Sequence, residues 1–279
     1  MKCLVTGGAG FIGSHLVDTL IKENHEVIVI DDESASENEK FHWNENAHNF
    51  KYDICDYTKI ESLFKNVNFV FHLAAESRIQ RAILDPVRTI NVNMIGTSNV
   101  LKASNKYKVN KFIYSSTSAY YGIKNTPPHV EKMDRDCLNL YSITKVAGED
   151  LVRMYQEMYG LETVILRYFN VYGERQPTKG QYAPVVGLFQ KMKDEGKKMT
   201  VVGDGLARRD YTHVQDVVRA NILAVEKKHT GKIFNIGTGI NYSILDIVKM
   251  IKGPFKFIPK RKGEAKETLP CLISASSSP

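Results

Sequence analysis

The sequence predicts an α/β fold, with a Rossmann-type, doubly wound parallel sheet and a smaller C-terminal lobe. Three observations support this prediction. A glycine turn, T-G-G-A-G-F-I-G at residues 6–13, lies between an apolar run and an amphipathic helical run. Apolar, β-prone segments then alternate with helical segments as far as residue 173. Tyr141 and Lys145 are four residues apart in a helical run, so they share one face of that helix.

The composition is that of an ordinary globular protein. With 279 residues, 43% of them apolar and 25% charged, the chain can form one large α/β domain or a main domain with a small satellite. The net charge of +7 suits an anionic ligand such as a nucleotide, but we favour the simpler interpretation of a lysine-rich solvated surface. No basic patch is interleaved with aromatic residues, so we expect no nucleic-acid partner.

Cysteine usage and hydropathy indicate the compartment. The four cysteines (Cys3, Cys55, Cys137 and Cys271) have neither C-x-x-C nor metal-ligand spacing, so we expect no metal site and a reduced setting. The N-terminus runs straight into a strand, without the pattern of a signal peptide, and no apolar run is long enough to span a membrane. We therefore expect a cytoplasmic protein with no membrane attachment.

The first βαβ unit has the features of a dinucleotide site. Strands are predicted at Lys2–Val5 and Glu26–Ile30, and the second ends at Asp31-Asp32. Glycines in the turn let a pyrophosphate approach backbone N–H groups at the helix N-terminus. A carboxylate after the second strand accepts hydrogen bonds from adenosine ribose hydroxyls and repels a 2′-phosphate, which favours NAD over NADP. Asp31 is the first choice and Asp32 the one-residue alternative; a purely structural turn is the competing interpretation.

The next segments continue the alternation. We predict a strand at Phe50–Ile54, ending in Asp53-Ile54, a short helix at Lys59–Lys65, a strand at Asn68–Leu73, a long helical region at Asp85–Lys106 and a strand at Lys111–Ser116. Ala74 and Ala75 follow the Asn68–Leu73 strand. Their small side chains either let a cofactor lie against the strand end or allow tight helix–strand packing, and the sequence leaves both open.

The second half of the chain contains the following predicted elements. A helix is predicted at Tyr141–Tyr159, a strand at Glu162–Leu166, a helix capped by Asp216 and running to Lys228, a strand at Ile233–Gly237 and a helix at Ile244–Ile251. We expect residues 1–173 to form the cofactor domain. Residues 174–279 should form mainly a substrate lobe, with 206–240 returning to the main domain. Residues 269–279 have no helical period and end in a serine-rich string, as in a truncated or altered lobe.

Six motifs together identify a family. These are T-G-G-A-G-F-I-G at 6–13, H-L-A-A at 72–75, S-S-T at 115–117, Y-S-I-T-K at 141–145, R-Y-F-N-V-Y-G at 167–173, and G-D-G at 203–205 with R-R-D-Y-T-H-V at 208–214. In this order they resemble the extended short-chain dehydrogenase/reductase family, the NAD-dependent sugar-nucleotide epimerases and dehydratases. The resemblance extends from Met1 to about Thr268. It also separates Tyr141/Lys145 from two other Tyr-x-x-x-Lys matches, Tyr107/Lys111 and Tyr120/Lys124.

The resemblance implies a catalytic group of Thr117, Tyr141 and Lys145. Tyr141 would take the proton of a sugar 4-hydroxyl, Thr117 would bind the same oxygen, and Lys145 would hold the nicotinamide ribose and lower the pKa of the phenol. The implied NAD-binding residues are Gly7, Gly10, Phe11, Ile12, Gly13, Asp31, Asp32, Asp53, Ile54, Leu73, Ala74, Ala75, Asn93, Ser115, Tyr141, Lys145 and Tyr168. The implied substrate-binding residues are Thr117, Asn170, Arg209, Arg261 and Glu264, although Arg261 also fits a plain solvated basic run.

The residues after Thr117 bear on the reaction. Dehydratases of this family carry acidic residues there, and related decarboxylases carry a glutamate, whereas this chain has Ser118-Ala119. Elimination of water needs a proton donor, so the missing acid favours C4 epimerisation of a nucleotide sugar. The segment L-A-A-E-S-R-I at 73–79 looks more like the dehydratase version, which keeps a 4,6-dehydratase or decarboxylase as the alternative. A non-catalytic NAD- or nucleotide-binding protein is the third possibility, because of the unusual C-terminal tail.

The resemblance also indicates the substrate and the assembly. A UDP-sugar is expected, either UDP-glucose/galactose or a UDP-N-acetylhexosamine. The small Thr268 stands near a position where relatives either narrow the sugar pocket or admit an N-acetyl group. A homodimer is expected, with helices at about 91–106 and 141–159 pairing across a two-fold axis.

Overall fold

The computed structural model describes residues 1–35, 38–178, 183–260 and 266–272. Its main feature is a seven-stranded sheet with the order β10-β6-β5-β4-β1-β2-β3, in which every neighbouring pair is parallel. The strands are β1 (Lys2–Thr6), β2 (Glu26–Asp31), β3 (His48–Lys51), β4 (Phe69–His72), β5 (Lys111–Thr117), β6 (Thr163–Tyr168) and β10 (Ile233–Ile236). This confirms the predicted doubly wound Rossmann-type sheet.

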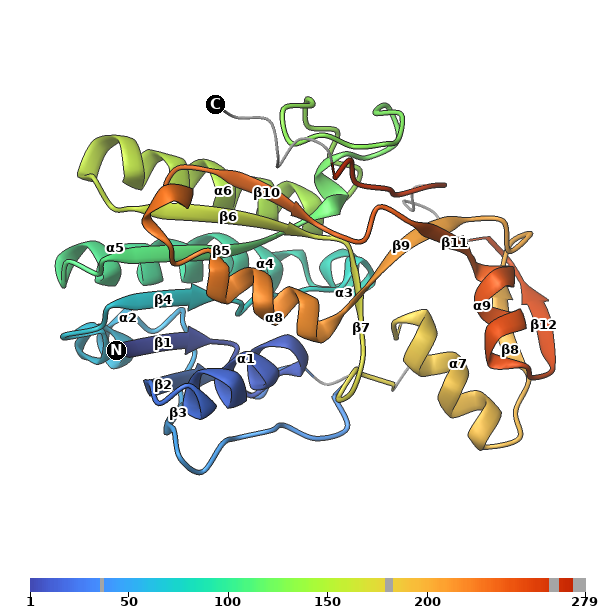
Figure 1. Ribbon diagram of the computed structural model, residues 1–279, viewed down its shortest axis with the longest axis horizontal. Coiled ribbons are helices and arrows are strands. Elements are labelled where there is room, and N and C mark those ends of the chain that lie inside the picture. The colour runs from blue at the N-terminus through green and yellow to red at the C-terminus, as the bar shows by residue number, and fades with distance from the viewer. Residues whose placement is uncertain (36–37, 179–182, 261–265, 273–279) are drawn as a thin grey trace.

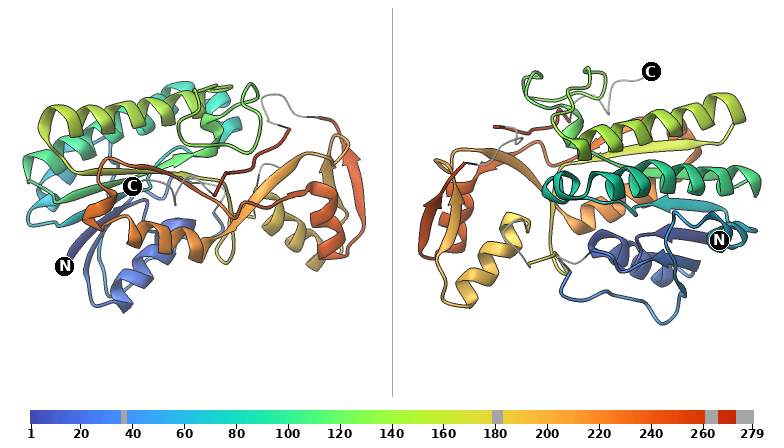
Figure 2. Two further views of the ribbon diagram at one scale, coloured as in Figure 1. Left: turned by 45° about the horizontal axis from the view of Figure 1, so that its top comes forward. Right: turned by 180° about the vertical axis from the view of Figure 1, so that it is seen from behind.

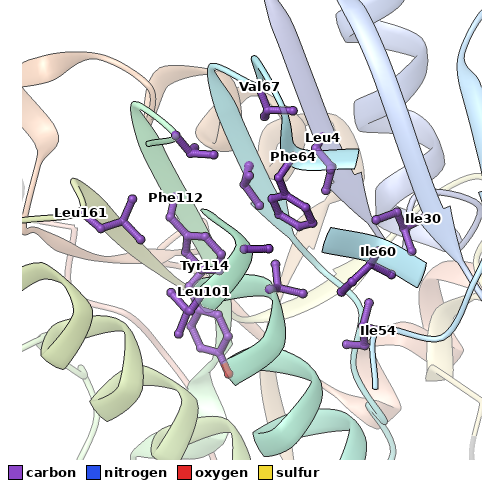
Figure 3. Close-up of a cluster of buried hydrophobic side chains, with 14 of the residues drawn as sticks. Leu4, Ile30, Ile54, Ile60, Phe64, Val67, Leu101, Phe112, Tyr114 and Leu161 are labelled. Carbon is purple, nitrogen blue, oxygen red and sulfur yellow. The ribbon is translucent and has the colours of Figure 1, made fainter. Parts of the chain in front are cut away.

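Helices cover both faces of this sheet (Figure 1). On one face α1 (Phe11–Lys22) and α8 (Val214–Leu223) pack with apolar residues of β1, β2 and β6. On the other face lie α2 (Tyr57–Ile60), η1 (Glu61–Phe64), α5 (Thr97–Lys106) and α6 (Leu140–Tyr159). Figure 3 shows the hydrophobic core on this second face, in which Phe64, Leu101 and Phe112 belong to one buried cluster. Because both faces are buried, the strands are nearly continuous apolar runs.

Two helix predictions need comment. The predicted region Asp85–Lys106 is helical throughout, but it contains a π-helical segment, η2 (Asn91–Gly96), between α4 (Pro86–Ile90) and α5; α3 (Ile79–Leu84) precedes it. The helix assigned to Asp216–Lys228 was placed wrongly. It is α8, capped by His213 and ending at Leu223, and Asp216 lies in its first turn, where a carboxylate also suits the helix dipole.

The smaller lobe stands beside the carboxyl ends of the main sheet (Figures 1 and 2). It consists of α7 (Val185–Asp194), β8 (Met199–Val202), α9 (Ile244–Ile251) and β12 (Phe255–Ile258), with β8 and β12 paired in parallel. Its own core contains Phe189, Met199, Val201, Ile247 and Val248. A three-stranded sheet, β11 (Asn241–Ser243), β9 (Arg208–His213) and β7 (Asn170–Tyr172), connects the lobe to the main sheet.

Asp210 of β9 fixes the segment that follows β10. Its buried carboxylate accepts hydrogen bonds from the backbone N–H groups of Thr238, Gly239 and Ile240, and from the Thr238 and Thr212 hydroxyls. A carboxylate with this many donors holds the loop between β10 and β11 in one arrangement against β9. The ladder that pairs β11 with β9 begins directly after this loop, with Asn241 opposite Asp210.

Residues 266–271 dock between β9 and the loop before α6. Arg208 N–H donates to the Lys266 carbonyl (2.9 Å) and Asp210 N–H to the Thr268 carbonyl (3.1 Å). The other end pairs with His129, whose N–H donates to the Leu269 carbonyl (2.7 Å) and whose carbonyl accepts from Cys271 N–H (2.8 Å). The tail as far as Leu272 therefore has strand-like partners, which its lack of helical period did not predict. Among the described residues, no helix is long and apolar enough to cross a membrane.

Replacing Asp210 by alanine is expected to lower the free energy of unfolding by about 2–4 kcal/mol, because several backbone donors lose their acceptor. Urea denaturation measures the change. The control is Asp216→Ala, on the exposed first turn of α8, which should change stability by about 0.5 kcal/mol. Equal effects of the two substitutions would contradict the role given to Asp210.

Candidate active site

A cavity of about 810 Å³ lies at the carboxyl ends of the main strands, between the sheet and the smaller lobe. Parallel strands bring the segments that follow β1, β2, β4, β5 and β6 to this edge. The residues expected from the sequence that line it are Gly7, Gly10, Phe11, Ile12, Gly13, Asp31, Asp32, Asp53, Ile54, Leu73, Ala74, Ala75, Ser115, Thr117, Tyr141, Lys145, Tyr168, Asn170 and Arg209, together with Thr268. The fold thus brings residues of all six sequence motifs to one cavity.

The glycine turn is shaped for close backbone contact. Gly7 has φ +70°, and a Cβ there would lie 2.8 Å from the Ala74 nitrogen. A Cβ on Gly13 would lie 2.1 Å from the Gly7 carbonyl oxygen, so helix α1 can approach the turn only with glycine at this position. Gly10 differs, because a Cβ there meets only the Gly7 oxygen at 3.4 Å. Substitution at Gly10 would therefore fill part of the cavity rather than distort the turn.

The N-terminus of α1 opens onto this cavity. Its N-cap, Gly10, offers no side chain, and no acidic residue stands in the first turn. The first backbone N–H groups of a helix lack intrahelical acceptors and attract anions. The turn and this helix end together fit a pyrophosphate.

Three carboxylates follow the strands beside the turn. Asp31, the last residue of β2, is buried and accepts from Ala9 N–H (3.1 Å) and Glu33 N–H (2.9 Å), and burial raises its pKa. Asp32 pairs with Arg88 at 2.9 Å. Asp53 accepts from Cys55 N–H at 2.8 Å. All three line the cavity, and Asp31 is the one that is also bonded to the glycine turn.

Tyr141 and Lys145 lie on the first turns of α6. The helix starts with a capping box, in which Asn139 and Ser142 satisfy each other's backbone N–H groups. Thr117, at the end of β5, lines the same cavity, and its hydroxyl is close enough to lower the pKa of the Tyr141 phenol in part. The two other Tyr-x-x-x-Lys matches have no such setting: Tyr107 follows the end of α5 and pairs with Glu61, while Lys124 is exposed in a loop.

The protonation equilibria differ from those expected for an isolated phenol–ammonium pair. Burial raises the pKa of Tyr141, although Thr117 and the charge of Arg78 lower it in part. Burial also lowers the pKa of Lys145 to about 7, and the charge of Glu149 opposes this shift. Removal from water disfavours both charged forms, so burial outweighs the contributions that lower the pKa of the Tyr141 phenol in this cavity.

Below Lys145, the chain buries an ion pair. Arg167 of β6 donates to both oxygens of Glu149 of α6, at 2.9 and 2.8 Å, and both side chains are fully buried. Ser116 of β5 donates to the same carboxylate, while the Arg167 guanidinium lies 3.3 Å from the centroid of the Tyr120 ring. The two hydrogen bonds from Arg167 join α6 to β6, and the bond from Ser116 joins α6 to the end of β5. Thr117 and Tyr141 lie next to these contacts in the sequence of β5 and on the same helix, respectively.

Three residues that we expected in the site already form hydrogen bonds within the protein. Asn93 lies beside the cavity rather than lining it, and its side chain bonds both backbone groups of Glu76 (2.7 and 3.0 Å) and the Thr144 hydroxyl (3.0 Å). Tyr168 bonds Ser115 and Asn221, and burial raises its pKa to about 12. The Asn170 amide donates to the Asp210 carbonyl at 3.2 Å. Asn93 thus joins the loop after β4 to the start of α6.

On the lobe side, Arg209 lines the cavity and donates to the Lys266 carbonyl (3.2 Å). Arg261 and Glu264 lie outside the described residues. Sequence reasoning missed several lining residues, among them Phe41, Arg78, Gln176, Phe189, Tyr211 and Lys260. The cue available for Arg78 was its place in the L-A-A-E-S-R-I segment, and the cue for Tyr211 was its place in R-R-D-Y-T-H-V. The others come from loops and the lobe, where the sequence carries no motif. Within the described ranges, no group of three or more His, Cys, Asp or Glu side chains is arranged to hold a metal ion.

Replacing Gly10 by alanine is expected to leave folding intact and to weaken NAD binding at least tenfold, because the added methyl group projects into the cavity where the backbone must approach a pyrophosphate. Calorimetric titration with NAD measures the affinity, and circular dichroism checks the fold. Gly13→Ala should instead reduce stability itself, given its 2.1 Å contact. Unchanged NAD affinity in folded Gly10→Ala protein would remove the pyrophosphate from this turn.

Comparison with known proteins agrees with this site. The sequence profile of the NAD dependent epimerase/dehydratase family matches residues 3–237. A putative UDP-glucose 4-epimerase from Methanocaldococcus jannaschii is 38% identical over 264 residues, which are 94% of this chain and 84% of that protein. A UDP-N-acetyl-alpha-D-glucosaminuronate decarboxylase from Bacillus cytotoxicus is 37% identical over 258 residues, 90% of this chain and 79% of that protein.

Among solved structures, a UDP-glucose 4-epimerase from Thermotoga maritima, crystallised with UDP-glucose, is 38% identical. The two structures superpose with a TM-score of 0.93, covering 99% of this chain and 91% of that one. The relatives thus include more than one chemistry on a single fold. The family profile, the relatives at 37–38% identity and the glycine turn at the cavity agree, and the chain belongs to the NAD dependent epimerase/dehydratase family, with NAD as its cofactor.

Proposed function

We propose that the protein epimerises a UDP-sugar at C4 through a 4-keto intermediate. The observation that carries this proposal is the wall of the cavity at the tip of β5. There Thr117, Tyr141 and Lys145 line the same cavity, and position 119, which lines it as well, offers only the methyl group of an alanine. The site therefore contains a base for oxidation at C4 and lacks an acid at the position where this family's dehydratases carry one.

The chain's own groups suit this chemistry. NAD, when bound, supplies a reversible acceptor for the hydride from C4. Tyr141 takes the proton of the sugar 4-hydroxyl, and Thr117 holds the same oxygen within hydrogen-bond reach. Lys145, when protonated, stabilises the phenolate by its charge. After the keto sugar presents its other face, C4 would take back the hydride on that face while Tyr141 returns the proton to the C4 oxygen, so that the sugar leaves with inverted C4 and the protein is unchanged.

The two parts of the chain divide the ligands between them. In our proposal, residues up to 173 hold NAD, and the later lobe holds the nucleoside diphosphate. Arg209 is placed at the cavity for a diphosphate, with Arg261 and Glu264 as further expected contacts. Asn170 and Thr268 stand beside each other, the Asn170 amide lying 3.4 Å from the Thr268 hydroxyl. The small Thr268 leaves an N-acetylhexosamine among the sugars to be tested.

A second candidate is a sugar-nucleotide dehydratase or decarboxylase, because Glu76 lines the same cavity. Its carboxylate lies 3.4 Å from Arg81, and Asn93 clamps its backbone on both sides. Epimerisation is the better-supported function, because position 119, two residues after Thr117, carries no acid that could serve elimination.

The substrate screen separates these functions. The protein is incubated with NAD and with UDP-glucose, UDP-galactose, UDP-N-acetylglucosamine and UDP-glucuronic acid, and the products are separated by chromatography. We expect the C4 epimer of at least one sugar. A stable keto product or released CO₂ identifies the second candidate, and NAD binding without any turnover identifies a non-catalytic nucleotide-binding protein.

Replacing Tyr141 by phenylalanine is expected to lower kcat for the accepted sugar by about 10²–10⁴-fold, because the proton acceptor is lost while the ring remains. NAD affinity should change little. Tyr107→Phe is the matched control, since Tyr107 also begins a Tyr-x-x-x-Lys pattern but bonds Glu61 away from the cavity. Full activity of the Tyr141→Phe enzyme would exclude Tyr141 as the base.

We also propose that the protein forms a homodimer through the outer side of α3, α4, η2 and α6. These elements carry exposed apolar side chains at Ile83, Leu84, Val87, Ile95 and Ile143. Unpartnered apolar area of this kind is uncommon on a monomer.

The substitution Val87→Glu is expected to shift the assembly from dimer to monomer, because a charge would be buried in the apolar contact. Multi-angle light scattering measures the mass. Met250→Glu, on the exposed side of α9, is the control and should leave the mass unchanged. A monomeric unmodified protein at micromolar concentration would contradict the dimer.

A further inference from the structure

We propose that Tyr114 is a positioning residue, whose ring face holds the Lys145 side chain in its charged form and in its place beside Tyr141. This inference rests on the function proposed above. Tyr114 belongs to β5, three residues before Thr117, and is fully buried beneath the start of α6.

The need for such a residue comes from the surroundings of Lys145. Lys145 is only 3% exposed and lines the cavity, and burial lowers the pKa of its ammonium group to about 7. An ammonium group held largely out of water is disfavoured relative to the neutral amine unless a neighbouring group favours its charge. The Tyr114 ring is such a neighbour, since its centroid lies 4.4 Å from Nζ. An aromatic face attracts a cation at this distance and does not attract a neutral amine in the same way.

The ring itself is fixed from three sides. The Tyr114 hydroxyl donates to the Lys145 carbonyl at 3.1 Å, so the same residue holds both the backbone and the side chain of Lys145. Gly148, one turn further along α6, makes room for this hydroxyl, because a Cβ there would lie 2.0 Å from its oxygen and 2.7 Å from Cζ. The His72 ring lies 5.8 Å away on the remaining side. A glycine inside a helix is unfavourable by about 1 kcal/mol, and its place here is explained by the tyrosine.

Other charges around Lys145 do not replace the ring. Glu149 raises the pKa of Lys145, but its carboxylate is engaged by Arg167 and Ser116. His72 is neutral, since burial lowers its pKa to about 3. The titratable or charged groups that face this site from the packed elements are His72 of β4, Tyr114 of β5, Tyr141 and Glu149 of α6, Arg167 of β6, and Arg78 at the N-terminus of α3.

The decisive variants are Tyr114→Leu, which removes the ring, and Tyr114→Phe, which keeps the ring and removes the hydroxyl. The readout is the ionisation of Lys145, followed by the pH dependence of its acetylation with acetic anhydride and measured by peptide mass spectrometry. The unmodified protein should show a midpoint at about pH 7. Tyr114→Leu should lower the midpoint by about half to one pH unit, while Tyr114→Phe should leave it nearly unchanged.

Activity gives a second readout. A lower Lys145 pKa means that less of the enzyme carries the ammonium at neutral pH. The alkaline limb of the kcat profile should therefore move to lower pH in Tyr114→Leu, with about a fivefold loss at pH 7 for a shift of one unit. A purely structural role would lower the unfolding midpoint without moving the pH profile. Folded Tyr114→Leu protein with an unchanged acetylation midpoint overturns the inference.

Gly148→Ala offers an independent route, should Tyr114→Leu fold poorly. Its methyl group must displace the ring from Lys145, so the acetylation midpoint should fall as in Tyr114→Leu. The double variant Gly148→Ala/Tyr114→Phe removes the oxygen at 2.0 Å and should recover part of the shift. The inference would also be overturned if the acetylation midpoint stayed unchanged in Gly148→Ala and the double variant showed no recovery. Acetylation requires no sugar, so this result stands even if no UDP-sugar is turned over and the proposed function fails.

Discussion

The buried ion pair of Glu149 and Arg167 is the interaction on which the site depends. Two charges removed from water are costly unless each finds its partner at good geometry, and here the guanidinium meets both carboxylate oxygens. The remaining donors of Arg167 reach the Tyr121 hydroxyl and the Glu131 carbonyl. One side chain therefore fixes α6, β6 and the loop that leads into α6. Removing Glu149 would leave the Arg167 charge buried without its carboxylate partner, whereas Glu149 also pairs with Arg153 at 3.1 Å.

The end of β5 connects this ion pair to the cavity. Ser115 bonds Tyr168 of β6, Ser116 bonds Glu149 of α6, and Thr117, the last residue of the strand, lines the cavity together with Tyr141. A strand buried on both faces cannot shift in register without breaking the first two contacts. The Thr117 hydroxyl, to which we assign a catalytic role in our proposal, is thus positioned by a strand whose residues are all buried.

The same burial sets the electrostatics of the site. A phenol and an ammonium in water favour each other's charged forms, but inside this cavity each loses hydration, so the pKa of Tyr141 rises and that of Lys145 falls to about 7. The charge state is then decided by contacts that the spacing of Tyr141 and Lys145 does not specify. These are the Tyr114 ring, the Glu149 carboxylate and the Thr117 hydroxyl.

The sequence by itself determined the main sheet, the glycine turn, the carboxylate after β2 and the helix that carries Tyr141. These features follow from local periodicity and from residues that only one kind of local structure explains. Gly13 is an example, because a side chain there would clash with the Gly7 carbonyl. Boundaries were less certain, as α8 shows, because Asp216 suits a first turn as well as a cap.

Only the tertiary structure decided what lies around the site. It showed that Asn93 clamps a loop beside the cavity, that residues 266–271 pair with β9 and His129, and that Lys145 rests on Tyr114. These contacts join segments that are distant in the chain and follow no sequence period. Long-range packing, rather than local propensity, creates them, and for that reason they could not be read from the residues alone.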